Sequence, residues 1–384
     1  MTDHHSVTSS KARWAVAAIF FINGFVWGNW APHIPLVMER LAVGPAVFGL
    51  ALLAIAAGAV IAMPVAGLFI NHYGSANVTR ITGTAMSLAI VAPMLAPEFT
   101  SFVVAALIFG ATIGSMDVAM NAHGIAVEKA MKLPIMSFFH GGFSLGGMAG
   151  AFLGAAMLGA LGETTHTITT ASITLVLLLI SFQFLLPSTV DQGLSGTSFA
   201  WPTRATIGLG LLCFLALMAE GSMIDWSAIL LRRRFALDAS TAALGYALYS
   251  AGMAVSRLIG DQARLRLGAA MLVRASALLT AVAIVVAVSI PEPIAAIGAF
   301  GIAGLGIGNI TPILFAGGGR LEPSAPGRGI AAVTTLGYLG FIAGPPLIGF
   351  AAEVSNLSLG LGLTALGALV IALRAGAARS ADTY

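Results

Sequence analysis

Long apolar segments recur along the whole chain, and glycine, proline or charged residues separate each one from the next. A helix of about 20 mostly apolar residues crosses a bilayer core of ~30 Å, so segments of this length predict transmembrane helices. The twelve segments cover residues 14–37, 46–70, 78–96, 100–126, 135–160, 167–187, 204–231, 240–262, 269–289, 292–316, 328–350 and 356–377. The pattern therefore predicts an all-α membrane protein with twelve transmembrane helices.

The longest polar segment between these spans follows the sixth one and runs from Pro187 to Arg204. It is too short for a folded domain, and we interpret it as a surface connector between two bundles of six helices. The predicted parts are a tail at residues 1–13, a first bundle at 14–187, a linker at 188–203, a second bundle at 204–377 and a tail at 378–384.

The basic residues predict how the bundles are oriented. Under this span assignment, thirteen Lys and Arg residues lie on the side of both termini, four lie on the opposite side, and Arg257 lies inside the eighth span. Cytoplasmic loops carry the excess of Lys and Arg in membrane proteins. Both termini and the linker are therefore predicted to be cytoplasmic.

Composition agrees with a membrane protein and excludes several function classes. The chain is 58% hydrophobic and 9% charged, and a soluble core of 384 residues would leave a large exposed apolar patch with such a composition. The sequence pI of about 9.3 follows from the loop charges. We therefore expect the lipid bilayer, and no nucleic acid, as a partner.

Signatures of catalysis and of bound cofactors are missing from the sequence. The single Cys213 excludes an intrachain disulfide and a cysteine-type metal site. No Gly-x4-Gly-Lys-Ser/Thr loop is present, so ATP is not expected to drive the protein directly. No metal-spaced His/Cys set and no Ser/His/Asp arrangement occurs. We expect neither an enzyme nor a cofactor or metal.

The two predicted bundles resemble each other. The first span contains "NGFVWGNWA" and the seventh contains "EGSMIDWSA". Asn23-Gly24 aligns with Glu220-Gly221, and Asn29-Trp30 aligns with Asp225-Trp226 when one gap is allowed. The fifth span carries glycine at every fourth position from Gly142 to Gly154. Duplicated halves with glycine-faced helices are typical of transporters that rock around a central site.

The loop after the second span carries a recognisable motif. Its residues "GLFINHYGS" place Gly67, Asn71 and Gly74 in a signature of the major facilitator superfamily, in which Asp usually stands where Asn71 is. The blocks "FHGGFSLGGMAGAF", "EGSMIDWSA" and "RLIGDQARLRLG" resemble a MosC-type branch of that superfamily, the type found in rhizopine loci.

This resemblance covers nearly the whole chain and carries several implications. It implies a secondary transporter of the bacterial inner membrane with two pseudo-symmetric six-helix halves. It also implies a small polar solute, polyol-like or sugar-like, and a gating or structural role for Gly67, Asn71 and Gly74.

Two carboxylates interrupt the seventh span in "LMAEGSMIDWSAILL", Leu217 to Leu231. Ionisable residues within a span rarely face lipid and are site candidates by default. Glu220 lies near the middle of the membrane and suits a group that takes up and releases a proton; the alternative is a protonated Glu bonded to a neighbouring helix. Asp225 lies nearer the outer surface, where we expect a gating or structural ion pair with the arginines at 232–234.

Other polar residues in the spans have competing interpretations. Asp117 and Asn121 share a helical face, so they are candidates for binding solute hydroxyls, and Asp117 also for a proton. His140 is a candidate proton relay, because imidazole titrates near neutral pH, or else it only satisfies a buried hydrogen bond. Arg257 requires an anion, and Asp261 four residues later favours a structural pair over a solute contact.

Amide and indole side chains suit a neutral polyhydroxyl solute, because they supply donors, acceptors and a flat apolar face. Trp226 has a second interpretation as part of the aromatic belt at the membrane surface. The predicted solute-binding residues are Asn23, Trp27, Trp30, Asp117, Asn121, Glu220, Trp226, Asn309 and Tyr338.

We therefore expect a monomeric secondary transporter that works by alternating access and is coupled to protons through Glu220, Asp117 and His140. One alternative is a proton-coupled efflux antiporter for drugs or metabolites. A second alternative is a membrane sensor or scaffold that transports nothing.

Overall fold

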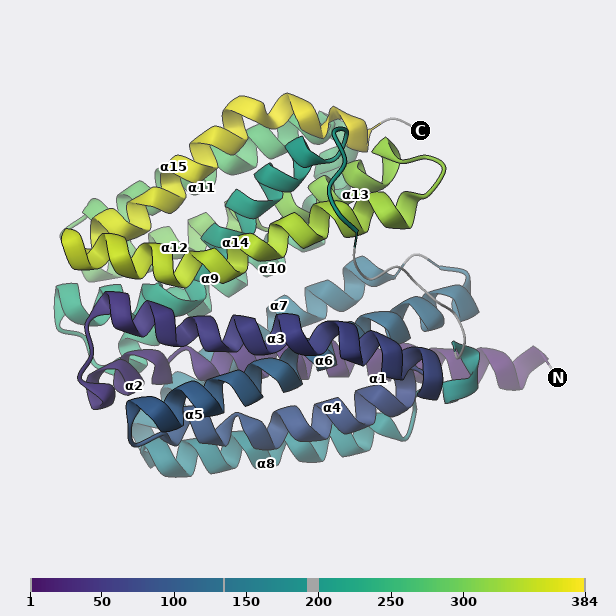
Figure 1. Ribbon diagram of the computed structural model, residues 1–384, viewed down its shortest axis with the longest axis horizontal. Coiled ribbons are helices and arrows are strands. Elements are labelled where there is room, and N and C mark those ends of the chain that lie inside the picture. Colours follow the sequence, from purple (N-terminus) through teal and green to yellow (C-terminus); the bar gives the residue numbers. More distant parts are fainter. Residues whose placement is uncertain (1, 134, 192–199, 383–384) are drawn as a thin grey trace. The chain divides into compact units, whose positions relative to one another are not determined.

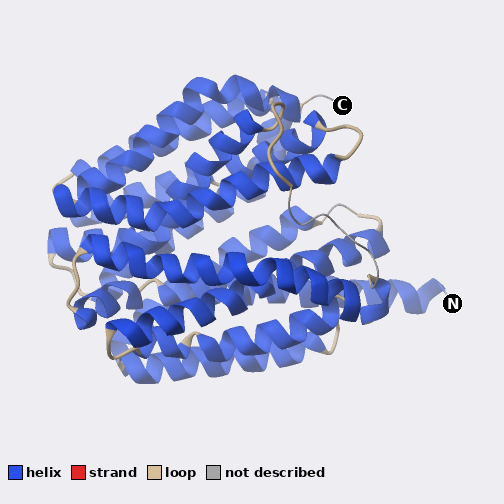
Figure 2. Cartoon of the chain, in the orientation of Figure 1, coloured by secondary structure: helices blue, strands red, loops and turns tan. Residues whose placement is uncertain are grey.

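The computed structural model describes residues 2–133, 135–191 and 200–382, which form helices joined by short loops with no strand (Figure 2). The chain divides into two compact units. The first unit consists of Met1–Leu41 and Ala54–Ser195, and the second consists of Ala42–Leu53 and Gly196–Tyr384. One long helix, α3, contributes to both units.

The helices follow one another along the chain in the order labelled in Figure 1. Up to the linker they are α1 (Thr2–Trp30), α2 (His33–Leu41), α3 (Pro45–Tyr73), α4 (Ser75–Ala89), α5 (Val91–Leu95), α6 (Phe99–Met131), α7 (Met136–Leu161), α8 (Glu163–Phe182) and the 3-10 helix η1 (Ser188–Val190). After it they are α9 (Ile207–Phe235), α10 (Ala239–Leu267), α11 (Ala269–Ser289), α12 (Pro293–Ile307), α13 (Ile310–Leu321), α14 (Pro326–Val354), α15 (Leu357–Arg374) and the 3-10 helix η2 (Ala375–Ala381).

Each predicted span overlaps one helix or two consecutive helices. Within the described residues, ten helical segments are long and apolar enough to cross a membrane. An eleventh is the pair Ser10–Trp30 and His33–Leu41, which is bent by 42°. Pro32 lies at this bend, and proline removes a backbone donor that a continuous helix would use.

The remaining predicted span, 240–262, corresponds to α10. It has 29 residues but is not among the segments that meet the apolar criterion. Its second half contains Arg257, Asp261, Arg264 and Arg266. At its start, the Thr241 hydroxyl and backbone N–H donate to the carboxylate of Asp238, which caps the helix and lowers the pKa of that carboxyl.

Helix α1 begins at Thr2, within the predicted N-terminal tail. Of the predicted linker, residues 192–199 lie outside the described residues. The division at 188–203 between the two bundles stays a prediction.

Glycine lets the first and fifth spans of the first unit pack closely. A Cβ atom on Gly24 of α1 would lie 1.9 Å from the Phe143 carbonyl oxygen, and one on Gly146 of α7 would lie 1.9 Å from that of Phe21. These distances leave no room for any side chain, so the predicted glycine stripe of the fifth span packs against α1. Close backbone approach of this kind stabilises helix pairs in lipid, where the hydrophobic effect does not drive helices together.

The second unit repeats this packing at equivalent positions. A Cβ atom on Gly340 of α14 would lie 2.0 Å from the Phe214 carbonyl oxygen of α9. A second repeated contact joins α6 to α3 at Gly110 and α12 to α10 at Gly304, where a Cβ would lie 1.9 Å from the carbonyl oxygens of Ile55 and Tyr249. Thus each unit pairs its first with its fifth span, and its second with its fourth.

The turn after the second span of each unit has the same construction. Gly74 and Gly268 have φ of 78° and 74°, a backbone conformation that favours glycine. The N–H that follows each glycine donates to an aspartate from beyond the last helix of its unit. Ser75 N donates to Asp191 Oδ1 at 3.1 Å, and Ala269 N donates to Asp382 Oδ2 at 2.6 Å.

Candidate functional site

A largely buried ion pair joins α9 to α10 in the second unit. The Arg257 guanidinium nitrogen Nη2 lies 3.6 Å from Glu220 Oε1, and each side chain is 13% exposed. Arg257 also donates through Nε to the Gly308 carbonyl oxygen at 3.4 Å. The structure thus gives Arg257 a carboxylate partner on another helix, whereas Asp261, the partner favoured from sequence, is exposed.

Asp225 lies on α9 beyond Glu220 and is 8% exposed. Within the part of the chain that the structure describes, no hydrogen bond or ion pair reaches its carboxylate. Of the arginines that were expected to pair with it, Arg232 donates to the Leu237 carbonyl oxygen and Arg234 to those of Val288 and Ser289. These contacts tie the end of α9 to backbone acceptors.

Aromatic residues of the second unit are buried with polar atoms that lack partners. Trp226 is fully buried, with its ring edge-on to Phe48 at 6.3 Å between centroids. Tyr246 and Tyr249 of α10 stack at 6.4 Å. Among the described residues, Trp226 Nε1 and the Tyr249 hydroxyl have no hydrogen-bond partner.

The other two predicted residues of this unit differ in their surroundings. Asn309 is 9% exposed and donates to the Ser256 carbonyl oxygen at 2.7 Å and to its hydroxyl at 2.8 Å. Its amide therefore already serves to hold the α12–α13 break against α10. Tyr338 is partly exposed on α14.

The first unit has its own polar residues in the spans. Asn121 Nδ2 donates to the Asp117 carbonyl oxygen at 2.8 Å and to its Oδ1 at 3.2 Å, and both side chains are partly exposed on α6. Asn23 is 1% exposed, and its Nδ2 has no hydrogen-bond partner within the described residues. An unpaired buried amide donor costs free energy that a ligand acceptor would recover.

The indoles of α1 differ in exposure. Trp27 is partly exposed and lies edge-on to Phe109 at 6.0 Å, whereas Trp30 is fully buried and stacks on Phe102 at 6.3 Å. The Nε1 of Trp30 has no partner among the described residues. Of these two predicted indoles, Trp27 is thus the one with accessible surface.

The remaining predicted residues lie near the cytoplasmic side of the first unit, in the predicted orientation. His140 is exposed on α7, edge-on to Phe20 at 5.2 Å. In the motif between α3 and α4, Gly67 is partly exposed, Asn71 is exposed and Gly74 is buried. A Cβ on Gly74 would lie 2.1 Å from the Ser188 carbonyl oxygen, which confines this turn to glycine.

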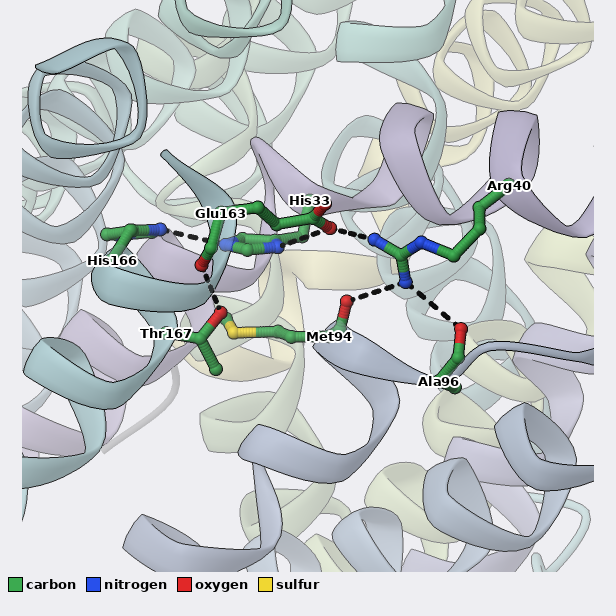
Figure 3. A network of polar contacts seen from close by, with 7 residues as sticks. All are labelled: His33, Arg40, Met94, Ala96, Glu163, His166 and Thr167. Carbon is green, nitrogen blue, oxygen red and sulfur yellow. Dashed lines mark hydrogen bonds and ion pairs between the residues drawn. The ribbon is translucent and has the colours of Figure 1, made fainter. Parts of the chain in front are cut away.

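The first unit also contains a charged cluster that sequence reasoning missed (Figure 3). His33 of α2 lies between His166 and Glu163 of α8, and Glu163 forms an ion pair with Arg40. In the predicted orientation, Arg40 is one of the four basic residues opposite the termini, and Glu163 is an acid in a loop on the same side. The cluster joins residues up to 133 positions apart, so only the presence of two histidines in apolar surroundings hinted at it.

Comparison with known proteins gives consistent matches over nearly the whole chain. The family model described as Major Facilitator Superfamily matches residues 16–345. An uncharacterized MFS-type transporter of Yersinia pestis is 36% identical over 357 residues, covering 93% of both chains. The membrane protein MosC of Rhizobium meliloti is 32% identical over 352 residues, covering 89% of this chain and 84% of MosC.

Solved structures show the same fold at low identity. The crystal structure of the nucleoside transporter NupG has a TM-score of 0.74 at 14% identity, covering 96% of this chain and 98% of that one. A bacterial homolog of the human lysosomal transporter Spinster, in an inward-facing and unoccupied conformation, has a TM-score of 0.72 at 13% identity, covering 97% of both chains.

Proposed function

This chain belongs to the Major Facilitator Superfamily, and we propose on that basis that it is a secondary transporter. It moves a small polar solute across the bacterial inner membrane by alternating access, as a monomer, and proton binding at Glu220 drives the transport. The observation that carries the proposal is the pair of Glu220 and Arg257, held together between α9 and α10.

The chemistry of this pair suits coupling. An ionised Glu220 is balanced by Arg257 at 3.6 Å, so the charge is tolerated inside the membrane. When Glu220 takes up a proton, the pair loses its attraction and Arg257 is left to interact with another acceptor. A carboxyl that exchanges its partner on protonation links proton movement to rearrangement of α9 and α10.

The unpaired polar atoms support a polar solute. Asn23 offers a buried amide donor without a partner in the described chain, and Trp27 offers a partly exposed indole face. Asp117 and Asn121 offer further acceptors and donors on α6. Hydroxyl groups of a polyol-like or sugar-like molecule pair with such groups, and its C–H faces pack on indole.

The relative named as an MFS-type transporter supports transport in general, and the solute has to be identified by experiment. The test uses purified protein in liposomes that contain a pH-sensitive dye. Polyols, amino-polyols, sugars and lipophilic cations are added outside, one at a time, to wild type, to Glu220→Gln and to Glu98→Gln. Glu98 is an exposed carboxylate at the start of α6 and serves as the matched control.

We expect one polar solute to acidify the lumen in wild type and in Glu98→Gln, and Glu220→Gln to lose this signal. If lipophilic cations instead move protons in the opposite sense, the protein is an efflux antiporter. If radiolabelled solutes of neither class move, with or without a pH gradient, the proposal of transport is wrong and a sensor or scaffold role replaces it.

A further inference from the structure

We propose that Nδ1 of His33 is a proton-binding site, separate from Glu220, whose occupancy strengthens the contact between α2 and α8. The site belongs to the cluster of His33, His166, Glu163 and Arg40, called the His33 cluster below (Figure 3). All four residues lie in the first unit. In the predicted orientation they lie at the end of that unit that faces away from the cytoplasm.

The inner part of the cluster is a chain of hydrogen bonds with no exposed atoms. His33 Nε2 lies 2.8 Å from His166 Nδ1, and the two rings stack at 4.9 Å with an interplanar angle of 16°. His166 Nε2 lies 2.9 Å from Asn29 Oδ1. The side chains of His33, His166 and Asn29 are all 0% exposed, so protein groups alone determine which nitrogen carries hydrogen.

The amide of Asn29 determines which nitrogen donates in each hydrogen bond between these side chains. Its Nδ2 donates to the Phe25 carbonyl oxygen at 2.8 Å, and its Oδ1 accepts from the Thr170 hydroxyl at 3.1 Å. Oδ1 is therefore an acceptor, and His166 must carry its hydrogen on Nε2. In a neutral His166, Nδ1 is then an acceptor, so His33 must donate through Nε2.

This order leaves one vacant position for a further proton. With hydrogen on Nε2, a neutral His33 has a bare lone pair on Nδ1, which is buried and has no hydrogen-bond partner among the described residues. A charged atom, Glu163 Oε1, lies 3.5 Å from this nitrogen. A lone pair facing a carboxylate is repelled, whereas a protonated Nδ1 forms a charge-assisted contact with the same oxygen.

Arg40 keeps the carboxylate in place for this role. It forms an ion pair with Glu163 and donates through Nη1 to the carbonyl oxygens of Met94 and Ala96, at 3.0 Å each. Glu163 is 30% exposed and Arg40 is 26% exposed. The proton therefore has a route from water through the exposed edge of Glu163 to the buried imidazole.

Charged and polar groups reach the surroundings of His33 from four helices. Its own helix supplies Arg40, and α8 supplies Glu163 and His166; α1 supplies the neutral Asn29, and α5 supplies the Met94 carbonyl. With both imidazoles neutral, Arg40 and Glu163 cancel. Protonation makes the cluster positive by one charge and adds an attraction between α2 and α8 that the neutral form lacks.

Nuclear magnetic resonance of ring-¹⁵N-labelled histidine, in full-length protein in lipid nanodiscs, tests this site directly. His33→Gln and His166→Gln identify the two signals. On titration between about pH 8 and about pH 5, His33 is expected to change from the Nε2–H form to the doubly protonated ring. His166 is expected to keep hydrogen on Nε2 throughout, because Asn29 accepts it.

Two further variants distinguish a specific site from general titration. Glu163→Gln removes the anion that faces Nδ1, so the protonated form of His33 should appear only at lower pH. Glu39→Gln neutralises an exposed carboxylate on the same helix and should leave the titration unchanged. Equal shifts in both variants would mean that His33 responds to overall charge, and the proposed pairing would be wrong.

The proposal fails if neutral His33 carries its hydrogen on Nδ1, or if its ring never becomes doubly protonated in that range. Neither readout requires a solute. Glu220→Gln should leave the His33 titration intact while it abolishes proton coupling. Failure of this site and failure of the proposed transport are thus observed separately.

Discussion

At the scale of single residues, the stability of the fold depends on Glu220 and Arg257 remaining paired. Two charges 3.6 Å apart with little exposure stabilise each other, but each is costly once the other is gone. Removing one partner of such a pair typically costs about 3–5 kcal/mol, because the remaining charge is buried without compensation.

Arg257→Gln should therefore lower the apparent melting temperature of the protein in detergent, and Glu220→Gln should lower it as well. The double variant should recover a large part of either loss, since no charge then remains unpaired. Differential scanning fluorimetry of the four proteins measures this coupling. Additive losses in the double variant would show that the two side chains do not act as a pair.

Sequence reasoning had a clear limit at this scale. It placed Glu220 within a span because an acid in an apolar segment is visible in the sequence. It favoured Asp261 as the partner of Arg257 because residues four apart on a helix are neighbours. The structure gives Arg257 a contact that crosses from α10 to α9, and no local pattern encodes contacts between helices.

At the scale of elements, apolar length predicted the helices well, because every span must satisfy its own backbone hydrogen bonds within lipid. The bend after Trp30 was not predicted, although Pro32 marks it. The bend matters for the His33 cluster, because it begins a separate helix, α2, with His33 at its first position.

The two equivalent turns give a matched pair of substitutions. Gly74 and Gly268 have almost the same backbone conformation, so alanine should cost about 1–3 kcal/mol at each from backbone strain alone. A Cβ at Gly74 would also lie 2.1 Å from a backbone oxygen, whereas one at Gly268 would meet only the Asp382 carboxylate at 3.3 Å.

Gly74→Ala should therefore destabilise the protein more than Gly268→Ala does, as measured by melting temperature in detergent. The two single variants control for each other, because their φ angles match. Equal losses in the two variants would mean that backbone strain, and not the collision with Ser188, decides the cost.

At the scale of the whole molecule, the two units share a framework of glycine-mediated helix pairs. The repeat was visible in the sequence at Asn23-Gly24 and Glu220-Gly221. The structure adds that the glycines of each unit contact equivalent partners. Which solute the framework carries is a property of a few side chains and not of the fold.

The predicted orientation is tested by fusing a reporter that fluoresces only in the cytoplasm. Fusions after Tyr384 and within the linker at 188–203 should fluoresce, and an insertion at Gly162, in the turn between α7 and α8, should not. Thirteen basic residues against four make this the favoured orientation. The reverse pattern would place the His33 cluster on the cytoplasmic side.

The aligned positions Asn29 and Asp225 show what duplication allows. In the first unit, the Asn29 amide is fully engaged by Phe25, Thr170 and His166. In the second, the Asp225 carboxylate is buried without a partner in the described chain. Two duplicated bundles can keep the same backbone arrangement while equivalent side chains take different chemical roles. The amide of the first unit has a structural role, whereas the carboxylate of the second unit is available for a different one. The two related bundles therefore divide structural and chemical roles between equivalent positions.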